Sequence, residues 1–220
     1  MIKVENIDPW GFEHAIRGMR NPMNSWDKSD SEWKIYTPEY PNLSEAEYIV
    51  GENDLDLMRR LYKAGSEHRT YARMIQVSMD ITAPLYWWKE MDRYTVGKSQ
   101  VSCSTMHKIA AKEFELDDFS HEHLKDSSID ILTSTIMELN SWRYIYLNGA
   151  VWCDKHDKDV WWQLIQLLPS SYNQRRTVCM SYETVFKIIK ERTGHKLDEW
   201  NDFVEILKDL PYIKQITSEE

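Results

Sequence analysis

The sequence predicts an α/β (α+β) fold in which a mixed sheet packs against long amphipathic helices. The first observation is the alternation between Tyr71 and Thr82, where one face is apolar and the other is mixed. The second is the recurrence of apolar residues at three- and four-residue spacing between Ile129 and Tyr146, which indicates a long helix. The third is the composition: 42% hydrophobic residues, with 10 Trp and 12 Tyr in 220 residues, are enough for a real core.

The first part of the chain consists of short elements separated by turns. Residues 1–7 alternate and predict a short strand that Asp8-Pro9 breaks. A short helix is expected around Phe12 to Met19. Three prolines between Asn21 and Asn42 are typical of turns, so this segment is predicted to be an irregular covering loop.

A second helix is predicted from about Asp54 to Ala64. Gly65 can close it, because glycine readily adopts the left-handed conformation that follows a helix. Ser44 to Glu47 has capping-box spacing, but Gly51 limits this segment to a brief turn.

The predicted strand leads almost directly into a helix. Pro84 suits the first helical position and Gly97 the position after the last, which predicts a helix over 84–96. The polar segment KSQVSCST, residues 98–105, therefore starts at a helix end.

The C-terminal half is predicted to be helical. The long helix ends at Asn148-Gly149, and a second apolar pattern runs from Trp161 to Pro169. A further helix spans 181–193, and a last one is centred on Phe203 to Leu207. Helices are therefore expected to form the majority of the fold.

Charge and cysteine usage limit the possible functions. A formal charge of −9 and a pI near 5.3 repel a polyanion, which excludes an extended nucleic-acid footprint but not a single nucleotide in a basic pocket. Three cysteines without CxxC spacing favour a reducing compartment. No apolar leader and no run of about 18 apolar residues occur. Residues 1–220 are therefore predicted to form a single cytoplasmic domain without a membrane partner.

Three segments resemble the flavin-dependent thymidylate synthases. AIRGMR, residues 15–20, looks like that family's VRAAR segment, and MIQVSMDITAPLYWWKEMDR, residues 74–93, looks like its strand, Ala-Pro and helix. LLPSSYNQRRTVCMSYETVFKIIKER, residues 167–192, is similar to its LP…TR…N…F…LR segment without a gap. The resemblance implies that family's fold and a homotetramer whose active sites are shared between subunits.

The family's signature, RHRxxSxNExSxR, falls on Arg93 to Thr105. Arg93 is kept, whereas the other fixed positions are replaced: Tyr94 and Thr95 stand for His-Arg, and Thr105 stands for the last arginine. Arginine forms paired, charge-assisted hydrogen bonds with phosphate that threonine cannot form. Each lost charged hydrogen bond is expected to cost about 1.5 to 3 kcal/mol of phosphate or cofactor affinity.

The resemblance nevertheless implies binding roles for particular residues. Those implied for cofactor binding are Arg93, Tyr94 and Gln100. Those implied for substrate binding are Arg93, Gln100, Ser102, Arg175 and Arg192. Residues 171–192 carry a net charge of +3, which suits a small anion. No catalytic nucleophile is expected, because in the resembled chemistry the reduced flavin delivers the hydride.

Plainer interpretations compete with these roles. Arg93 and Arg192 lie near predicted helix ends, where the helix dipole favours a solvated cation, and Arg175-Arg176 fits an exposed basic pair. The adjacent Trp87 and Trp88 are predicted to pack in the core or in an interface. Cys103 lies among serines, which indicates burial or solvation more often than catalysis. The histidines and cysteines lack the paired spacing of a zinc site, so no metal is expected.

Three functional hypotheses follow. The first is a divergent thymidylate synthase-like flavoprotein that binds a flavin or a pyrimidine nucleotide; with the parent activity kept, FAD, NADPH and methylene-tetrahydrofolate would serve to methylate dUMP at C5. The second is a phage or mobile-element protein that has lost FAD and serves as a nucleotide-binding or interaction protein. The third is a structural α/β oligomer that shares only the architecture.

Overall fold

A computed structural model describes residues 2–36 and 45–218. Its contacts form two compact units. The first unit contains Met1–Glu5, Asp80–Arg93 and Gln100–Thr177. The second unit contains Asn6–Met79, Tyr94–Ser99 and Val178–Glu220. That residues 1–220 form a single domain stays a prediction.

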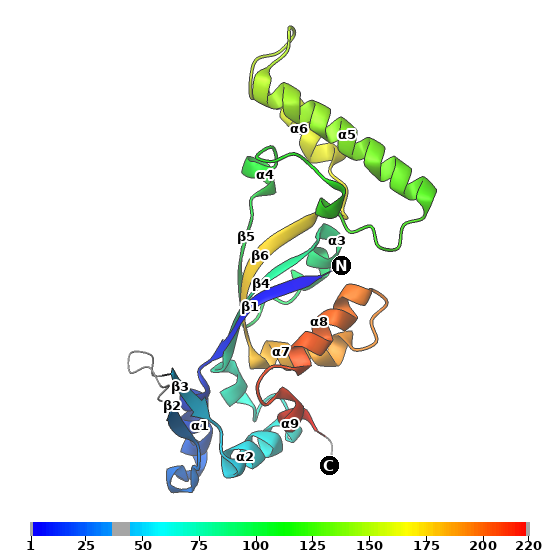
Figure 1. Cartoon of the computed structure of the whole chain (residues 1–220). Helices are drawn as coiled ribbons and strands as arrows, with labels where there is room; N and C mark the ends of the chain where they lie inside the picture. The colour runs from blue at the N-terminus through cyan, green and yellow to red at the C-terminus, as the bar shows by residue number, and fades with distance from the viewer. Residues whose placement is uncertain (1, 37–44, 219–220) are drawn as a thin grey trace. The chain divides into compact units, whose positions relative to one another are not determined.

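A four-stranded sheet has the strand order β1-β4-β6-β5 (Figure 1). Its strands are β1 (Lys3–Trp10), β4 (Gln76–Pro84), β5 (Lys98–Ser102) and β6 (Asn173–Ser181). Each of these strands has residues in both units. Ser181 N–H donates to Gly97 O, and Cys103 N–H donates to Arg175 O, so β5 runs antiparallel to β6. The prediction of a mixed α+β fold is confirmed, because this sheet is combined with the helices described below.

The second unit contains most of the helices and a two-stranded hairpin. Its helices are α1 (Phe12–Arg20), α2 (Glu52–Lys63), α7 (Tyr182–Arg192), α8 (Asp198–Lys208) and α9 (Ile213–Thr217). The short 3-10 segments are η1 (Asn21–Met23), η2 (Trp26–Lys28) and η3 (Thr70–Arg73). The hairpin pairs β2 (Glu32–Tyr36) with β3 (Glu45–Ile49) in antiparallel register. Local sequence sets several of these boundaries: the Ser181 hydroxyl, for example, caps α7 by accepting from Thr184 N–H.

The first unit is built around a helix pair. Its elements are α3 (Leu85–Met91), α4 (Thr105–Lys108), η4 (Leu116–Asp118), α5 (Asp126–Asn148) and α6 (Lys158–Leu167). Helices α5 and α6 lie side by side (Figure 1). Leu132, Ile136 and Leu139 of α5 share one apolar cluster with Leu164 of α6. The Asp157 carboxylate starts α6 by accepting from the N–H groups of Asp159 and Val160.

Most of the predicted helices are confirmed within a few residues. The predicted helices at 12–19 and 54–64 are α1 and α2, and the long helix does end at Asn148, followed by Gly149. In β4 the predicted alternation is also confirmed, because Ile75, Val77, Met79 and Ile81 are all buried. Periodicity predicts these elements well since one side of each is buried.

Several predicted breaks and loops were wrong. Asp8-Pro9 does not break β1, and the reason is that β1 is the edge strand of the sheet, where proline is tolerated. Residues 32–36 of the predicted loop form β2, and the predicted turn at Glu47 lies in β3. Pairing between these two strands supplies hydrogen bonds that local composition does not reveal. Residues 37–42 of the predicted loop and Ser44 lie outside the described residues.

Two predicted boundaries around the central strand were also wrong. Tyr71 lies in η3 rather than in the strand, because its ring is buried and its hydroxyl donates to Met58 O of α2 at 2.9 Å. The helix predicted over 84–96 ends at Met91. Gly97 does not close that helix: its φ is +68°, and a Cβ there would lie 2.6 Å from Ser181 Oγ. Glycine is needed at this position because the chain passes close to the start of α7.

Several other elements were not predicted. Among them are β5, which contains most of the polar segment, β6, which contains Arg175 and Arg176, and the short helices α4 and α9. Both adjacent tryptophans, Trp87 and Trp88, are fully buried, so the prediction of core packing is confirmed for both.

Over the two described ranges of the chain, no helix combines the length and the apolar character needed to cross a bilayer.

Candidate functional site

The predicted site residues fall into both units. Arg93, Gln100, Ser102 and Arg175 belong to the first unit. Tyr94 and Arg192 belong to the second unit. Each group has its own set of contacts.

A polar cluster in the first unit is centred on Asp92, just after α3. Asp92 Oδ1 accepts hydrogen bonds from Gln100 Nε2 and from Arg176 Nη1, both at 2.7 Å. Arg176 Nε donates to Gln174 Oε1 at 2.9 Å, and Arg176 Cζ lies 4.2 Å from the centre of the Trp88 ring. We call these five residues the Asp92 cluster. It holds one guanidinium between a carboxylate and an aromatic face, and its formal charges balance.

Strand geometry explains why neighbouring arginines of β6 have different surroundings. Successive side chains of a strand point to opposite faces, so Gln174, Arg176 and Val178 share the more buried face while Arg175 lies on the other. Arg175 Nη2 donates to Asp80 Oδ2 at 2.7 Å, and this hydrogen bond raises the pKa of Arg175. Thr177 Oγ1 also donates to the Asp80 carboxylate. Arg175 is thus exposed, as the plainer interpretation predicted, but the side chain of Arg176 is only 12% exposed, so the two arginines do not form an exposed basic pair.

Arg93 and Ser102 remain available in the first unit. Both are exposed, and neither side chain makes a hydrogen bond or an ion pair within residues 2–36 and 45–218. Arg93 follows α3 directly, and Ser102 is the last residue of β5. An exposed guanidinium without a carboxylate partner suits a phosphate or a carboxylate of a ligand.

A second cluster surrounds Arg192 at the end of α7. Arg192 Nε donates to the Tyr94 hydroxyl at 2.9 Å, and Arg192 Cζ lies 4.5 Å from the centre of the Trp200 ring. Arg192 Nη1 lies 3.1 Å from His195 Nε2. The structure therefore brings together two predicted residues, Tyr94 and Arg192, that are far apart in the sequence. We call these residues, with Glu191, the Arg192 cluster.

Tyr94 links the two charges of the Arg192 cluster. Burial raises the pKa of Tyr94, so its hydroxyl stays protonated at neutral pH. The hydroxyl donates to Glu191 Oε2 at 2.9 Å while it accepts from Arg192. The guanidinium is thereby fixed in orientation next to an aromatic face. That Arg93 and Arg192 meet at one ligand stays a prediction, because the two arginines belong to different units.

Sequence reasoning missed the partners that hold these arginines. Trp88, Asp92 and Arg176 of the Asp92 cluster were not predicted as site residues, nor were His195 and Trp200. Strand alternation would have separated Arg176 from Arg175 if β6 had been recognised. No sequence signal pairs Trp200 with Arg192, since that contact depends on how α7 and α8 pack.

The cysteines and histidines form no further site. Cys103, Cys153 and Cys179 are free thiols. No group of three or more His, Cys, Asp or Glu residues that could hold a metal ion occurs within the described part of the chain. Cys103 is exposed, as solvation of the serine-rich segment predicts.

Two solved structures resemble this chain over nearly its whole length. One is thymidylate synthase X (ThyX) from Helicobacter pylori with FAD and dUMP, with a TM-score of 0.65 and 16% identity; the alignment covers 98% of this chain and 96% of that chain. The other is the flavin-dependent thymidylate synthase ThyX from the same organism, complexed with FAD and dUMP, with a TM-score of 0.62, 17% identity and coverages of 97% and 95%. No protein-family model matches the chain, and no curated protein matches it. At this low identity the likeness shows the fold, which confirms the fold that the resemblance predicted.

Proposed function

We propose that this chain, which has the fold of the flavin-dependent thymidylate synthases, binds a flavin or a pyrimidine nucleotide. The observation that carries the proposal is the likeness, over 98% of the chain, to a structure that contains FAD and dUMP. The fold alone does not define a function, so the proposal also depends on the cationic residues that the chain offers.

Arg93 is the residue best suited to the anionic part of such a ligand. It is the kept position of the family's signature, it is exposed, and it has no partner among the described residues. Gln100 and Arg176 are held together by Asp92, which gives the neighbouring surface a fixed arrangement of donors. Tyr94, the next residue in the chain, contacts Arg192 in the second unit. A phosphate at Arg93 and a base near Gln100 are what this arrangement supports.

The donor set fits one phosphate better than the diphosphate of FAD. In the first unit, Arg175 is paired with Asp80 and Arg176 with Asp92, whereas Arg93 has no carboxylate partner in the described residues. Bound FAD would supply the redox chemistry that protein side chains lack. The finer form of the proposal is methylation of dUMP at C5 with NADPH and methylene-tetrahydrofolate, and it requires that FAD binds.

A second candidate function is nucleotide binding without FAD. The observation that favours it is that the Asp92 cluster satisfies its own charges, while threonine replaces the last arginine of the signature. In this form the protein is a non-catalytic nucleotide-binding or interaction protein on the same fold, as a phage or mobile element could encode. A purely structural oligomer is the third candidate.

One ligand screen separates these functions. The thermal unfolding midpoint is measured with FAD, FMN, NADPH, dUMP and other pyrimidine nucleotides, together with the absorbance of the purified protein near 450 nm. A flavin band or a midpoint raised by FAD supports the flavoprotein, and a midpoint raised by dUMP alone supports the FAD-free binder. No shift with any ligand contradicts both and favours the structural oligomer.

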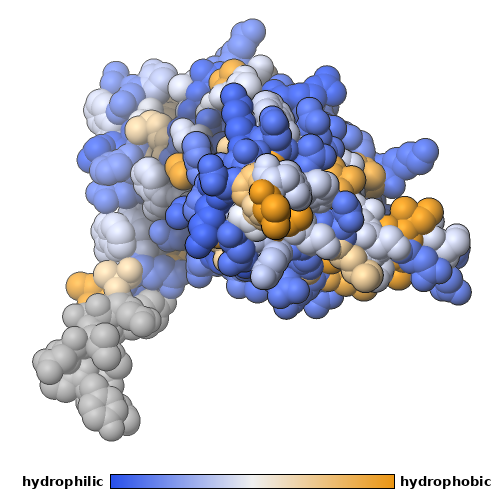
Figure 2. Space-filling model, turned by 90° about the horizontal axis from the view of Figure 1, so that it is seen from above, coloured by the Kyte–Doolittle hydropathy of each residue, from blue (hydrophilic) through white to orange (hydrophobic). Residues whose placement is uncertain are grey.

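We also propose a cytoplasmic homo-oligomer, a homotetramer by the resemblance. Met137 and Tyr144 lie seven residues apart on α5 and are 67% and 66% exposed, so they share an uncovered side of that helix. Apolar patches interrupt the hydrophilic surface in the view of Figure 2. A second subunit would bury such residues. Light scattering during size-exclusion chromatography measures the subunit number, and a monomer would contradict the proposal.

A further inference from the structure

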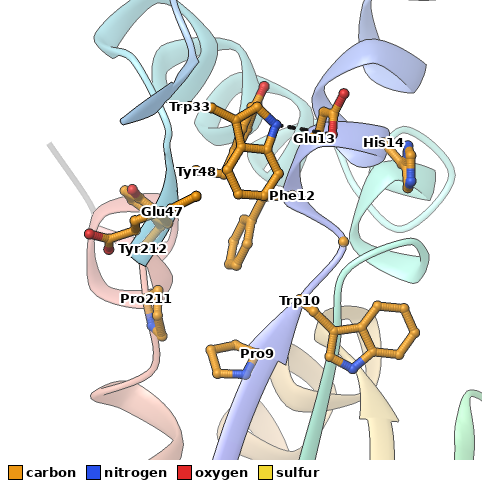
Figure 3. A pocket seen from close by; sticks show the side chains of 12 residues that line it. Pro9, Trp10, Phe12, Glu13, His14, Trp33, Glu47, Tyr48, Pro211 and Tyr212 are labelled. Atoms are coloured by element: carbon orange, nitrogen blue, oxygen red, sulfur yellow. Dashed lines mark hydrogen bonds between the residues drawn. The ribbon is translucent and has the colours of Figure 1, made fainter. Parts of the chain in front are cut away.

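The second unit contains an aromatic cavity that the proposed function does not use. Its volume is about 440 Å³, which is within the range of small-molecule sites. It lies where β1 passes into α1, beside the β2–β3 hairpin and the residues that precede α9 (Figure 3). None of the residues that line it was predicted as a site residue.

A glycine creates the turn that forms the wall of this cavity. Gly11 separates β1 from α1 with φ at +95°, and a Cβ there would lie 2.4 Å from the Met74 carbonyl oxygen. Only glycine permits this approach, and the turn places Phe12 on the wall. Tyr212 also has a positive φ, +64°, although it is not a glycine. Its hydroxyl accepts from Val50 N–H at 3.1 Å, which holds this strained residue against the cavity.

Aromatic rings supply most of the lining. The rings of Phe12 and Tyr212 meet edge to face with centres 5.5 Å apart, and those of Trp33 and Tyr48 meet likewise at 5.4 Å. Figure 3 shows the side chains of Trp33 and Tyr48 close together. Trp33 is 55% exposed, so part of a large aromatic surface faces solvent at the cavity. Such a surface attracts an apolar or cationic ligand group.

The charged side chains that line the cavity have one sign, while Arg17, which does not line it, contacts the lining residue His14 with Nη2 3.2 Å from Nδ1. Two carboxylates, Glu13 and Glu47, line it, and none of its lining residues is a lysine or an arginine. Glu13 Oε2 accepts from Trp33 Nε1 at 3.3 Å, which places a carboxylate at the edge of the exposed indole. Glu47 pairs with Lys34 in the hairpin register, so its charge is partly balanced. Glu13 is therefore expected to contribute more than Glu47 to the attraction of a cation.

We propose that this cavity binds a small organic cation, a quaternary or tertiary ammonium that carries an apolar or aryl substituent. The cationic group lies over the Trp33 and Tyr48 rings beside Glu13, and the apolar substituent contacts Phe12 and Tyr212. A partly exposed pair of aromatic rings with a carboxylate beside it suits such an ion, because the face of an aromatic ring attracts a cation. The proposal does not depend on the flavin or nucleotide site, because none of its residues belongs to that site.

Calorimetric titration with a matched pair of ligands tests the charge preference. Benzyltrimethylammonium and phenylmethanesulfonate carry the same aryl group with opposite charges. The full-length protein is expected to bind the cation at least tenfold more tightly than the anion, because the carboxylates attract one and repel the other. Equal binding of both ligands, or no binding of the cation, overturns the proposal.

Three variants locate the site. Trp33→Ala and Glu13→Gln are each expected to weaken cation binding by about five- to tenfold, since each removes one part of the recognition. Trp26→Ala is the matched control, because Trp26 is 52% exposed and does not line the cavity. Glu13→Gln keeps the side-chain volume, so it tests the charge even if Trp33→Ala fails to fold. An equal loss in Trp26→Ala, or unchanged binding in Glu13→Gln, places the cation elsewhere and overturns the proposal.

Discussion

The guanidinium of Arg192 lies over the Trp200 ring, with Cζ 4.5 Å from the ring centre, and its Nε donates to the Tyr94 hydroxyl. This contact joins the end of α7 to the start of α8 within the second unit. A planar, forked cation is required to stack and donate at the same time. Arg192 therefore has a stabilising role whether or not it also binds a ligand.

Arg192→Lys is expected to lower the free energy of unfolding by about 1 to 2 kcal/mol, because lysine keeps the charge but loses the stacking and the Nε hydrogen bond. Urea unfolding followed by far-UV circular dichroism measures this change. Arg60→Lys is the control, since Arg60 is exposed and forms only a surface pair with Asp56. If both variants are equally stable, the stacked geometry does not contribute.

Asp54→Asn is expected to lower the free energy of unfolding by about 3 to 5 kcal/mol, because it removes the charge that balances the buried Arg20. The fully buried Asp54 carboxylate accepts from Arg20 Nε at 2.5 Å, from Ser29 Oγ at 2.7 Å and from Ser31 Oγ at 2.6 Å. Denaturant unfolding is the measurement. Asp56→Asn lies on the same helix with an exposed side chain, and it is expected to change stability by less than about 0.5 kcal/mol.

The same carboxylate predicts a pH dependence of stability. Burial raises the pKa of Asp54, but hydrogen bonds from Ser31, Ser29 and Arg20 outweigh burial and hold the pKa below its usual value. A lowered pKa in the folded state adds stability above the unfolded-state pKa of about 3.9, and this contribution is lost as the pH falls through the folded pKa. Unfolding free energies measured from pH 7 to pH 3 are therefore expected to fall more steeply in the wild type than in Asp54→Asn. Parallel curves would show that Asp54 does not carry this dependence.

Substitution of Gly11, which precedes α1, separates the cost of a steric clash from the cost of backbone strain. Gly11→Ala is expected to lower the free energy of unfolding by about 1 to 2 kcal/mol, because alanine disfavours the left-handed conformation. The clash of its Cβ with Met74 O is expected to cost about 1 to 3 kcal/mol more. Gly65→Ala is the matched control, because its φ is +112° but, apart from its chain neighbours, no atom of residues 2–36 and 45–218 lies within 4 Å of an added Cβ. Thermal unfolding midpoints should therefore fall clearly further for Gly11→Ala. Equal losses would mean that the chain at Met74 moves aside at little cost.

The elements that the sequence predicted are those with one buried side. Helix α5 and strand β4 repeat their apolar residues at the period of their own geometry, so burial on one side is visible in the sequence. Strand β5 consists mainly of polar residues, and β2 leaves even its apolar Trp33 and Ile35 exposed. These strands are stabilised by pairing with a neighbouring strand, which no single segment reveals. For the same reason the sequence predicted Asp54 only as the start of a helix and Gly97 only as the residue after one.

In the candidate site, too, some residues were predicted from the sequence and others were not. The family resemblance implied roles for Arg93 and Gln100 through the signature and for Arg192 through the segment 167–192. Their partners, among them Asp92 and Trp200, were not predicted because those contacts join segments distant in the sequence. A motif identifies the residues that meet a ligand, whereas the residues that fix them in place follow from the packing.

Arg93→Ala is expected to abolish the shift of the unfolding midpoint caused by dUMP or FAD while leaving the ligand-free midpoint within about 1 °C of the wild type, because substitutions away from packed contacts change stability little. The reason is that the Arg93 side chain is exposed and has no partner within the described residues. Lys89→Ala, which removes an exposed cation from the preceding helix, is the control and should leave the ligand shift intact. Arg192→Ala provides the contrast, since the loss of its stacking should lower the ligand-free midpoint as well. An undiminished ligand shift in Arg93→Ala would mean that the kept signature arginine does not hold the anion, and the proposed site would then have to be abandoned.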